Sequence, residues 1–298
     1  MKKELLSLSG VPFFMPEGVP FAALDIDPTT RFYRTSLLSR VFLIKGGPLP
    51  DSPLTEIIYS LEQESDDFDI LEDLAKELKD TPLLITYNGK AFDLPHLKKK
   101  CELYRIPSFV SEKRCEDLML TLRPYARLFS LRTRRLSDYV SLLPENENLT
   151  DNAQRALAAT SLRAFAVLVQ GGFSVKRGSC LEGEAFFELA PKVPIPCRLS
   201  FSEDPFSLSA SPEKTELRAL LQDGLLRRYY RDYKSYRFLT HEGYAVHRSV
   251  AEYVGSDRQK KATRENCYSY VKCSEKFLSN PESMKSYVLS ALIWLSRI

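Results

Sequence analysis

Three aspartates follow apolar runs at points where their carboxylates could share a metal ion. Asp25 and Asp27 lie at the end of FAALDID, with one residue between them. On an extended strand, residues i and i+2 point to the same face, so both carboxylates can face one site. Asp93 follows a second apolar run, PLLITYN, after a break at Gly89. Because clustered carboxylates repel one another unless a cation intervenes, this set favours Mg²⁺ or Mn²⁺.

The same spacing also fits a simpler structure. Aspartate is common where a chain turns, and Pro28 directly follows Asp27, so the pair could cap a turn and do no chemistry. His96 lies one turn beyond Asp93 on a predicted helix. A single histidine in an amphipathic helix is typical of a structural residue.

The elements that would position these acids alternate between strands and helices. We predict strands at 21–26, 41–47, 54–63 and 82–88, from short apolar runs bounded by Gly and Pro. Helical spacing of apolar residues predicts helices over 66–80, from near Phe92, and over 152–170, where Gly171 and Gly172 end the last one. RCEDLML predicts a further strand that runs into a helix. This order predicts an α/β protein, a mixed sheet flanked by helices.

Domain organisation follows from the same pattern. Residues 1–20 are expected to be an N-terminal lead-in, and residues 21–172 a single α/β domain. Residues 173–298 are less regular in pattern and predict a smaller C-terminal α+β extension of unknown role.

The composition is that of a globular protein without a membrane anchor. Hydrophobic residues make up 44% of the 298 residues, and the net charge of +3 permits a nucleic-acid partner without requiring one. The six cysteines form no CxxC pair and no secretory signal precedes them, so we expect a cytoplasmic protein with reduced thiols. Every apolar run is shorter than the roughly 20 residues of a membrane span.

Several motifs resemble one family. DIDPTT resembles the DIETTG element, and LITYNGKAFDLPHLKKKCELYRIP resembles the YNGxxFDxPxL element, of the ribonuclease H-fold exonucleases called DEDD, particularly their YprB-like branch. CEDLML, with Asp117, resembles that branch's HLDLxH strand, and LRTRRLSDYV its following helix. The resemblance covers residues 20–172, and the tail containing YYRDYKSYRFLTHEGYAVHRSVAEYV resembles an extension found in bacterial members.

The resemblance implies a ribonuclease H-like fold and two-metal hydrolysis of phosphodiester bonds in DNA or RNA, usually from a 3′ end. Asp25, Asp27 and Asp93 would hold Mg²⁺ or Mn²⁺, with Asp117 as a further candidate ligand. A single-stranded end of the nucleic acid would be the substrate. Asn88 and Phe92 would orient Asp93 or the terminal nucleotide, and Lys90 lies between them as a nucleic-acid contact.

Two positions depart from the family pattern. The family's second acid is Glu, and Asp27 is shorter by one methylene. Its fourth acid falls on Thr160, leaving at most a hydroxyl for the metal, and Ala156 replaces the possible base. Asp151 cannot substitute, since nine helical residues separate it from Thr160 by about 13 Å. Two hypotheses therefore remain: an active exonuclease, or a catalytically inactive pseudo-nuclease that binds nucleic acid or protein.

Charge is segregated along the chain. Between Lys98 and Arg135 there are eleven Lys or Arg against four Asp or Glu. Arg132, Arg134 and Arg135 at its end are candidate phosphate contacts, although a solvated helix face explains part of this segment equally well. RRYYRDYKSYRF at 227–238 interleaves bases with aromatics, which suits stacking on unpaired bases. It also suits a half-buried strand, which we favour.

Overall fold

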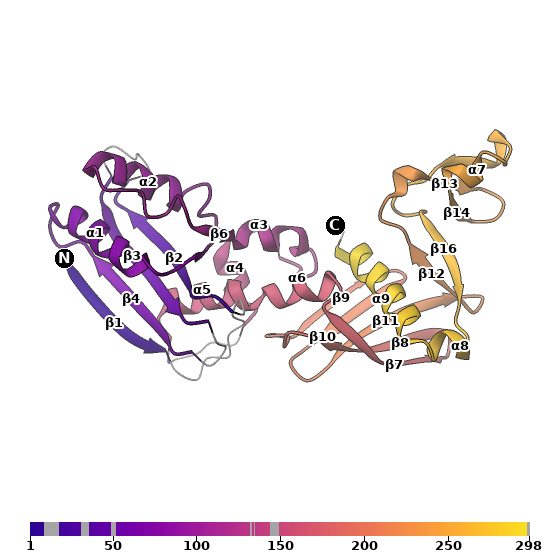
Figure 1. Ribbon diagram of the computed structural model, residues 1–298. Coiled ribbons are helices and arrows are strands. Elements are labelled where there is room, and N and C mark those ends of the chain that lie inside the picture. The colour runs from indigo at the N-terminus through magenta and orange to yellow at the C-terminus, as the bar shows by residue number, and fades with distance from the viewer. Residues whose placement is uncertain are drawn as a thin grey trace. The chain divides into compact units, whose positions relative to one another are not determined.

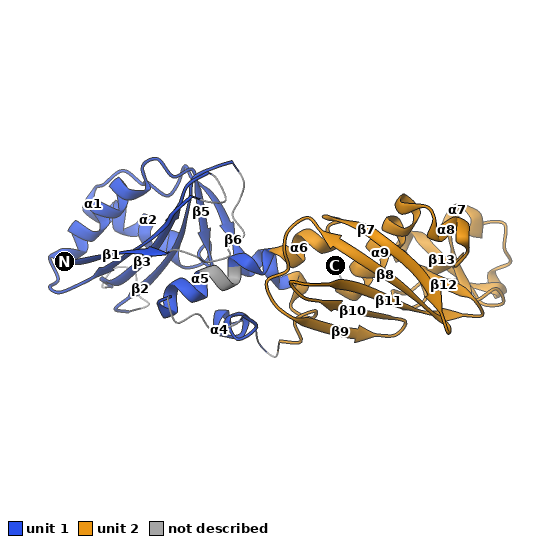
Figure 2. Cartoon of the chain, turned by 90° about the horizontal axis from the view of Figure 1, so that it is seen from below, with its two compact units in different colours: residues 1–123, 132–163 blue, residues 124–131, 164–298 orange. Residues whose placement is uncertain are grey.

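The computed structural model describes residues 1–8, 18–30, 36–48, 52–131, 133, 135–143 and 149–296. The chain forms two compact units (Figure 2). Unit 1 comprises Met1–Arg123 and Arg132–Arg163, and unit 2 comprises Pro124–Leu131 and Ala164–Ile298. Unit 1 therefore contains every residue predicted to bind metal.

Unit 1 is built on a six-stranded mixed sheet (Figure 1). Its strands are β1 (Lys2–Leu8), β2 (Phe21–Pro28), β3 (Leu38–Gly46), β4 (Leu54–Ser60), β5 (Leu83–Thr86) and β6 (Arg114–Asp117). Their order across the sheet is β1-β4-β3-β2-β5-β6. The first four pair antiparallel, whereas β5 is parallel to β2 and β6 is parallel to β5. All the strands predicted between residues 21 and 120 are present.

Helices lie on both faces of this sheet. They are α1 (Asp66–Leu78), α2 (Asp93–Tyr104), α3 (Leu118–Leu122), α4 (Leu136–Val140) and α5 (Asp151–Ser161), with a short 3₁₀ turn, η1 (Arg123–Tyr125), after α3. Helices α1 and α2 cover one face, and α5 lies on the other (Figure 2). The alternation of β2 explains this: Leu24 and Ile26 join the core beneath α1 and α2, while Ala23 and Asp25 line a pocket with α5.

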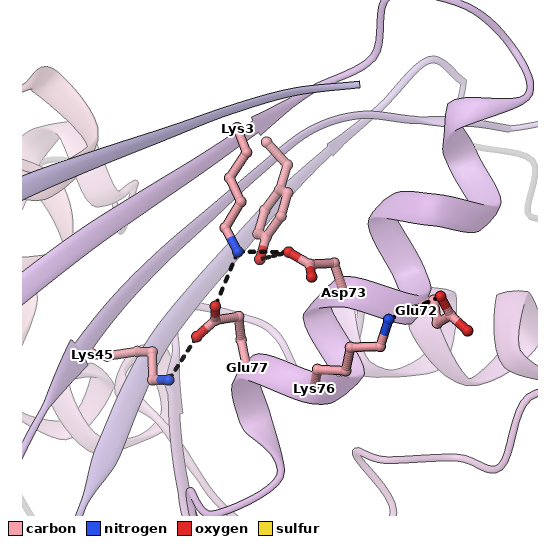
Figure 3. A network of polar contacts seen from close by, with 7 residues as sticks. Lys3, Lys45, Glu72, Asp73, Lys76 and Glu77 are labelled. Carbon is pink, nitrogen blue, oxygen red and sulfur yellow. Dashed lines mark hydrogen bonds and ion pairs between the residues drawn. The ribbon is translucent and has the colours of Figure 1, made fainter.

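Residues 2–8 form an edge strand, so the expected lead-in over 1–20 contains part of the sheet. Ion pairs hold β1 against α1: Lys3 Nζ lies 2.6 Å from Asp73 Oδ2 and 3.0 Å from Glu77 Oε1 (Figure 3). Lys45 Nζ on β3 lies 2.7 Å from Glu77 Oε2. Backbone pairing and ion pairs, more than burial, hold the edge strand β1 in place. Its sequence, KKELLSL, therefore shows little apolar periodicity.

The helix predicted over 152–170 is interrupted. It consists of α5 and α6 (Arg163–Val169), separated at Leu162. The compact units also divide there, at 163/164, whereas the sequence suggested a boundary at 172/173. Gly171 has a φ of +91°, so the predicted stop after α6 is present.

Unit 2 is mostly antiparallel β structure. Its strands are β7 (Phe173–Leu181), β8 (Glu184–Pro191), β9 (Leu199–Glu203), β10 (Phe206–Ala210), β11 (Thr215–Gln222), β12 (Leu225–Tyr229), β13 (Tyr236–Leu239), β14 (Tyr244–His247), β15 (Gln259–Lys261) and β16 (Tyr268–Lys272). Strands β13 to β15 form a separate three-stranded sheet, and the others form one seven-stranded sheet. Besides α6, whose residues from Ala164 on belong to unit 2, its helical elements include α7 (Arg248–Ala251), α8 (Glu275–Leu278), α9 (Pro281–Ser296) and two 3₁₀ turns, η2 (Tyr233–Ser235) and η3 (Ser256–Arg258).

The long helix α9 closes the core of unit 2. The Tyr287 ring lies 5.4 Å from that of Phe187 on β8, and the Trp294 ring lies 5.6 Å from that of Phe206 on β10. Aromatic packing of this kind lets one helix cover a sheet. Within the described residues, none of the helices is long and apolar enough to cross a membrane.

Candidate active site

Strand β2 presents Asp25 and Asp27 on one face, as the i, i+2 spacing predicts. Both side chains are exposed, whereas Ile26 between them is buried. Asp25 lines a pocket between the sheet and α5. The strand extends to Pro28, with an irregularity of pairing only after Asp27, so both aspartates stay on extended backbone.

Asp93 approaches this pair from the neighbouring strand. β5 runs parallel to β2, with Ala23 opposite Ile85, so the carboxyl ends of both strands meet at the same edge of the sheet. A tight turn follows β5 and leads into α2, whose first residue is Asp93. The Asp93 side chain is only 3% exposed. The topology therefore buries a third carboxylate beside the two on β2.

The backbone geometry of the turn after β5 restricts which residues can occupy it. Asn88 has a φ of +65°, a left-handed conformation that asparagine tolerates better than most residues. A Cβ on Gly89 would collide with the Thr86 side chain, so only glycine fits without displacement. The Asn88 carbonyl accepts hydrogen bonds from the backbone N–H groups of Ala91 and Phe92. The NGK segment is thus a scaffold for the start of α2.

The electrostatics of the acids are coupled. Burial raises the pKa of Asp93 to about 8, and the charges of Asp25, Asp117 and Asp27 add to this rise. Asp25 has access to solvent, yet nearby protein partly desolvates its carboxyl, which raises its pKa to about 6 together with the charge of Asp27. Four carboxylates therefore lie in one another's field, and a bound cation would relieve their repulsion.

Asp117 has a positioning role in this structure. Its Oδ1 accepts hydrogen bonds from the N–H groups of Asn88 (2.8 Å) and Met119 (3.1 Å), and its Oδ2 accepts one from Lys90 N–H (3.1 Å). The carboxylate thus caps α3 and fixes the turn after β5. With these three hydrogen bonds made, Asp117 is better suited to hold the turn than to bind metal.

Helix α5 contributes a positively charged side chain, Arg155, to the region where the family pattern expects an acid. Thr160 is buried, and its hydroxyl donates to the carbonyl of Ala156 at 2.8 Å, a bond within the helix. Arg155 lines the same pocket as Asp25, and its charge opposes the rise in the Asp25 pKa. Sequence reasoning missed Arg155. Its place one residue before Ala156 in the aligned helix was the available signal.

Glu56 is a second acid that sequence reasoning missed. It lies on β4, is buried, and lines the pocket together with Asp25. Thr150 Oγ1 donates to both of its carboxylate oxygens, at 2.7 and 2.9 Å. Burial raises the pKa of Glu56, and the Thr150 hydrogen bond opposes that rise. Register places Glu56 opposite Ile44, two strands away from β2, so it lies beside the three aspartates and not among them.

Only some of the residues predicted to contact nucleic acid are exposed in the described part of the structure. Lys90 is exposed beside the turn, while Phe92 is half-buried and packs on the core beneath α2. Arg135 is exposed at the start of α4. Arg132 and Arg134 lie outside the described residues. The structure thus leaves Lys90 and Arg135 as side chains available to phosphate.

Part of the basic segment is used internally. Lys100 is buried, and its Nζ lies 2.6 Å from Asp67 Oδ2, in an ion pair between α2 and α1. Lys113 Nζ donates to the carbonyls of Leu78 (2.5 Å) and Thr81 (2.8 Å) at the end of α1. The charge segregation seen in the sequence therefore partly reflects contacts between these elements.

The donors at the site fit a hard divalent cation in their chemistry. Asp25, Asp27 and Asp93 offer carboxylate oxygens, and no Lys or Arg within the described ranges forms an ion pair with them. Within those ranges, no three His, Cys, Asp or Glu side chains are arranged to hold one ion. Binding a cation would therefore require these carboxylates to reorient.

Residues 44–140 match the model of the RNase_H superfamily, and the chain carries an RNase H superfamily domain over that stretch. The match includes Asp93 and Asp117 and begins after Asp27. The mixed sheet flanked by helices is RNase H-like, as predicted, and the C-terminal half is mostly antiparallel β structure. Members of this superfamily typically use Mg²⁺, and the fold generally implies nucleic-acid substrates.

Among solved structures, the chain is similar to the family B DNA polymerase from the hyperthermophilic archaeon Pyrobaculum calidifontis, with 14% sequence identity and a TM-score of 0.36. The similarity covers 53% of this chain and 26% of the polymerase chain. No curated protein matches the sequence.

Proposed function

We propose that the protein is a metal-dependent nuclease of the DEDD exonuclease type, in its YprB-like branch, acting on single-stranded ends of DNA or RNA from the 3′ side. The observation that carries this proposal is the meeting of Asp25, Asp27 and Asp93 at one edge of an RNase H-like sheet. Carboxylates placed together in this way destabilise one another unless they bind a cation.

In this proposal, Asp25, Asp27 and Asp93 hold Mg²⁺ or Mn²⁺ through their carboxylate oxygens. Bound metal would supply Lewis-acid stabilisation of phosphate oxygens and activation of the attacking water. Asp117 acts as a positioning residue, because it holds the turn that places Asp93. Lys90 is exposed on that turn and would attract the phosphate backbone.

Asp93→Asn tests this function. We expect the wild-type protein with Mn²⁺ to shorten 5′-labelled single-stranded DNA or RNA stepwise, and Asp93→Asn to leave it intact while keeping its circular dichroism spectrum. Asp69→Asn is the matched control, since Asp69 is an exposed acid on α1. Activity of Asp93→Asn equal to that of the wild type would remove Asp93 from the mechanism.

Arg155 favours a second candidate function, a pseudo-nuclease that binds nucleic acid or protein without hydrolysis. Its positive charge acts on Asp25 from α5, and the Thr160 hydroxyl is bonded within the same helix. Under this candidate, Arg155 partly replaces a cation. Arg155→Ala should then bind Mn²⁺ more tightly than the wild type in calorimetry, whereas Lys98→Ala, an exposed base on α2, should not.

A further inference from the structure

Unit 2 contains a wide groove of its own. Its walls are the segment 228–234 at the end of β12, the segment 262–265 before β16, and the face of α9 that carries Ser286, Ser290 and Trp294. Its volume is about 1080 Å³. This exceeds the roughly 300–1,000 Å³ of pockets that hold one drug-sized ligand, so the groove suits an extended ligand.

The groove is lined by cations that lack carboxylate partners. Four bases line it: Arg228, Arg231, Lys234 and Arg264. Arg228 donates to the Ser286 hydroxyl at 2.8 Å, and Arg264 donates to the Trp294 carbonyl. Across the described part of the chain, none of the four forms an ion pair with Asp or Glu.

Some bases elsewhere in unit 2 form ion pairs with acids. Arg127 with Glu203 (2.8 Å) and Lys214 with Glu216 (2.7 Å) are examples. The groove also contains two acids: Asp232 accepts a hydrogen bond from the Ser235 hydroxyl, and hydrogen bonds from its own N–H and from Thr263 lower the pKa of Glu265. The four cations outnumber the two acids, so the groove carries a net positive charge that is suited to an anion.

One aromatic ring in the groove is open for stacking. Tyr230 is already stacked on Tyr236, with ring centroids 4.6 Å apart and planes at 14°, and Trp294 packs on Tyr229 at 4.7 Å. Tyr233, by contrast, is 36% exposed in the 3₁₀ turn η2. Tyr233 lies between Arg231 and Lys234 in the sequence. An unpaired nucleobase could therefore stack on its ring while the adjacent phosphates contact the two cations.

We propose that this groove binds single-stranded nucleic acid, with Arg231 and Lys234 contacting phosphates and Tyr233 stacking on an unpaired base. The identity of the anion as nucleic acid rests on the proposed function of unit 1. The groove adds a binding site on unit 2, outside the RNase H-like unit.

The test is fluorescence anisotropy with the full chain and a labelled oligothymidylate of about 20 nucleotides, a length that covers known single-strand sites. EDTA removes any contribution from metal at the carboxylates. We expect the double variant R231A/K234A to bind roughly 10-fold more weakly and to lower the slope of log affinity against log salt by about 1.4, for two lost phosphate contacts. K272A/K276A, which removes two exposed bases of unit 2 outside the groove, should bind as the wild type does.

Two variants of Tyr233 test the stacking contact separately. Tyr233→Ala should weaken binding roughly 5-fold or more, and Tyr233→Phe, which keeps the ring, should retain wild-type affinity. A duplex of the same length should bind more weakly than the single strand. Equal binding of R231A/K234A and the wild type, an equal loss in K272A/K276A, or tighter binding of the duplex would each overturn the proposal.

The same variants separate this proposal from the nuclease proposal. Asp93→Asn should keep wild-type oligonucleotide affinity in EDTA. If the groove variants bind normally while Asp93→Asn loses hydrolysis, the groove proposal fails and the nuclease stands. If Asp93→Asn hydrolyses normally while R231A/K234A loses binding, the nuclease mechanism fails and the groove stands.

Discussion

At the scale of single residues, the buried Asp93 carboxyl is the most informative group in the molecule. It is nearly inaccessible to solvent and lies in the field of Asp25, Asp27 and Asp117. An acid in this position is costly to ionise unless a cation neutralises it. A protein that needed Asp93 only for packing would be more stable with a neutral residue there, which supports the proposed metal-binding role of Asp93.

This cost gives a pH prediction for the metal-free protein. The pKa of Asp93 is 3.8 for the ordinary group and about 8 in the fold, mainly through burial, so the folded state holds a proton that the unfolded state releases. The free energy of unfolding should therefore fall as pH rises from about 4 to about 8. Asp93→Asn removes this loss and should be more stable than the wild type by about 5 kcal/mol near pH 8, at about 1.4 kcal/mol per pKa unit, with little gain near pH 4.

Urea unfolding in EDTA at both pH values measures this difference. Asp69→Asn, at an exposed position, is the control and should show no such pH-dependent gain. A constant difference between Asp93→Asn and the wild type across the pH range would contradict the assigned ionisation of Asp93.

At the scale of elements, the turn between β5 and α2 decides where Asp93 lies. Asp117 holds that turn from the neighbouring strand through hydrogen bonds to Asn88 and Lys90. The motif NGKAFD was visible in the sequence, and so was the strand containing Asp117. That the two meet depends on β6 pairing beside β5, with Thr86 opposite Asp117, which no local pattern specifies.

Asp117→Ala should destabilise unit 1 by about 2–4 kcal/mol, because three N–H groups lose their acceptor. Asp117→Asn keeps one oxygen and should lose less. Urea unfolding with far-ultraviolet circular dichroism measures both variants. If Asp117→Ala were as stable as the wild type, the carboxylate would not be holding the turn.

The strands of unit 1 were predicted from the sequence and the regular sheet of unit 2 was not, and burial explains the difference. The buried strands of unit 1 are short apolar runs between Gly and Pro, so their pattern was clear. In unit 2 the strands are half-buried, and two hairpin turns carry the signal: Glu182–Gly183 and Asp223–Gly224, all with positive φ. The alternating burial of β8 and β11 accompanies these turns. Reading them as hairpins would have predicted the regular sheet in a region expected to be less regular.

The predicted site residues show a similar division. Asp25, Asp27 and Asp93 were predicted because they follow strands, and the structure brings them to one edge of the sheet. Arg155 and Glu56 were not found, because each reaches the pocket through packing of α5 and β4 on distant strands. Spacing along the chain carries no information on such contacts.

At the scale of the whole molecule, the two compact units are interleaved in sequence. Residues 124–131 belong to unit 2 although unit 1 resumes after them. Within unit 2, the Phe129 ring lies 5.1 Å from that of Phe165, and Arg127 pairs with Glu203. A division of the chain at residue 172 would therefore remove parts of the unit 2 core.

We predict that a fragment of residues 173–298 is less stable than the same region in the full chain. In the full chain, Phe129→Ala should cost unit 2 about 3–5 kcal/mol, since Phe129 is buried. Leu120→Ala, at an exposed position of α3, is the control and should cost far less. Thermal unfolding monitored by circular dichroism compares all of them, and an isolated fragment as stable as the full chain would rule out this dependence.

The central claim is that the carboxylates at the end of β2 and the start of α2 bind a divalent metal ion. Isothermal titration calorimetry of Mn²⁺ into the wild-type protein tests it directly, with Asp25→Asn and the exposed-site variant Asp69→Asn beside it. We predict saturable binding by the wild type and Asp69→Asn, and its loss in Asp25→Asn. Absence of saturable binding in the wild type, or unchanged binding in Asp25→Asn, would contradict the account.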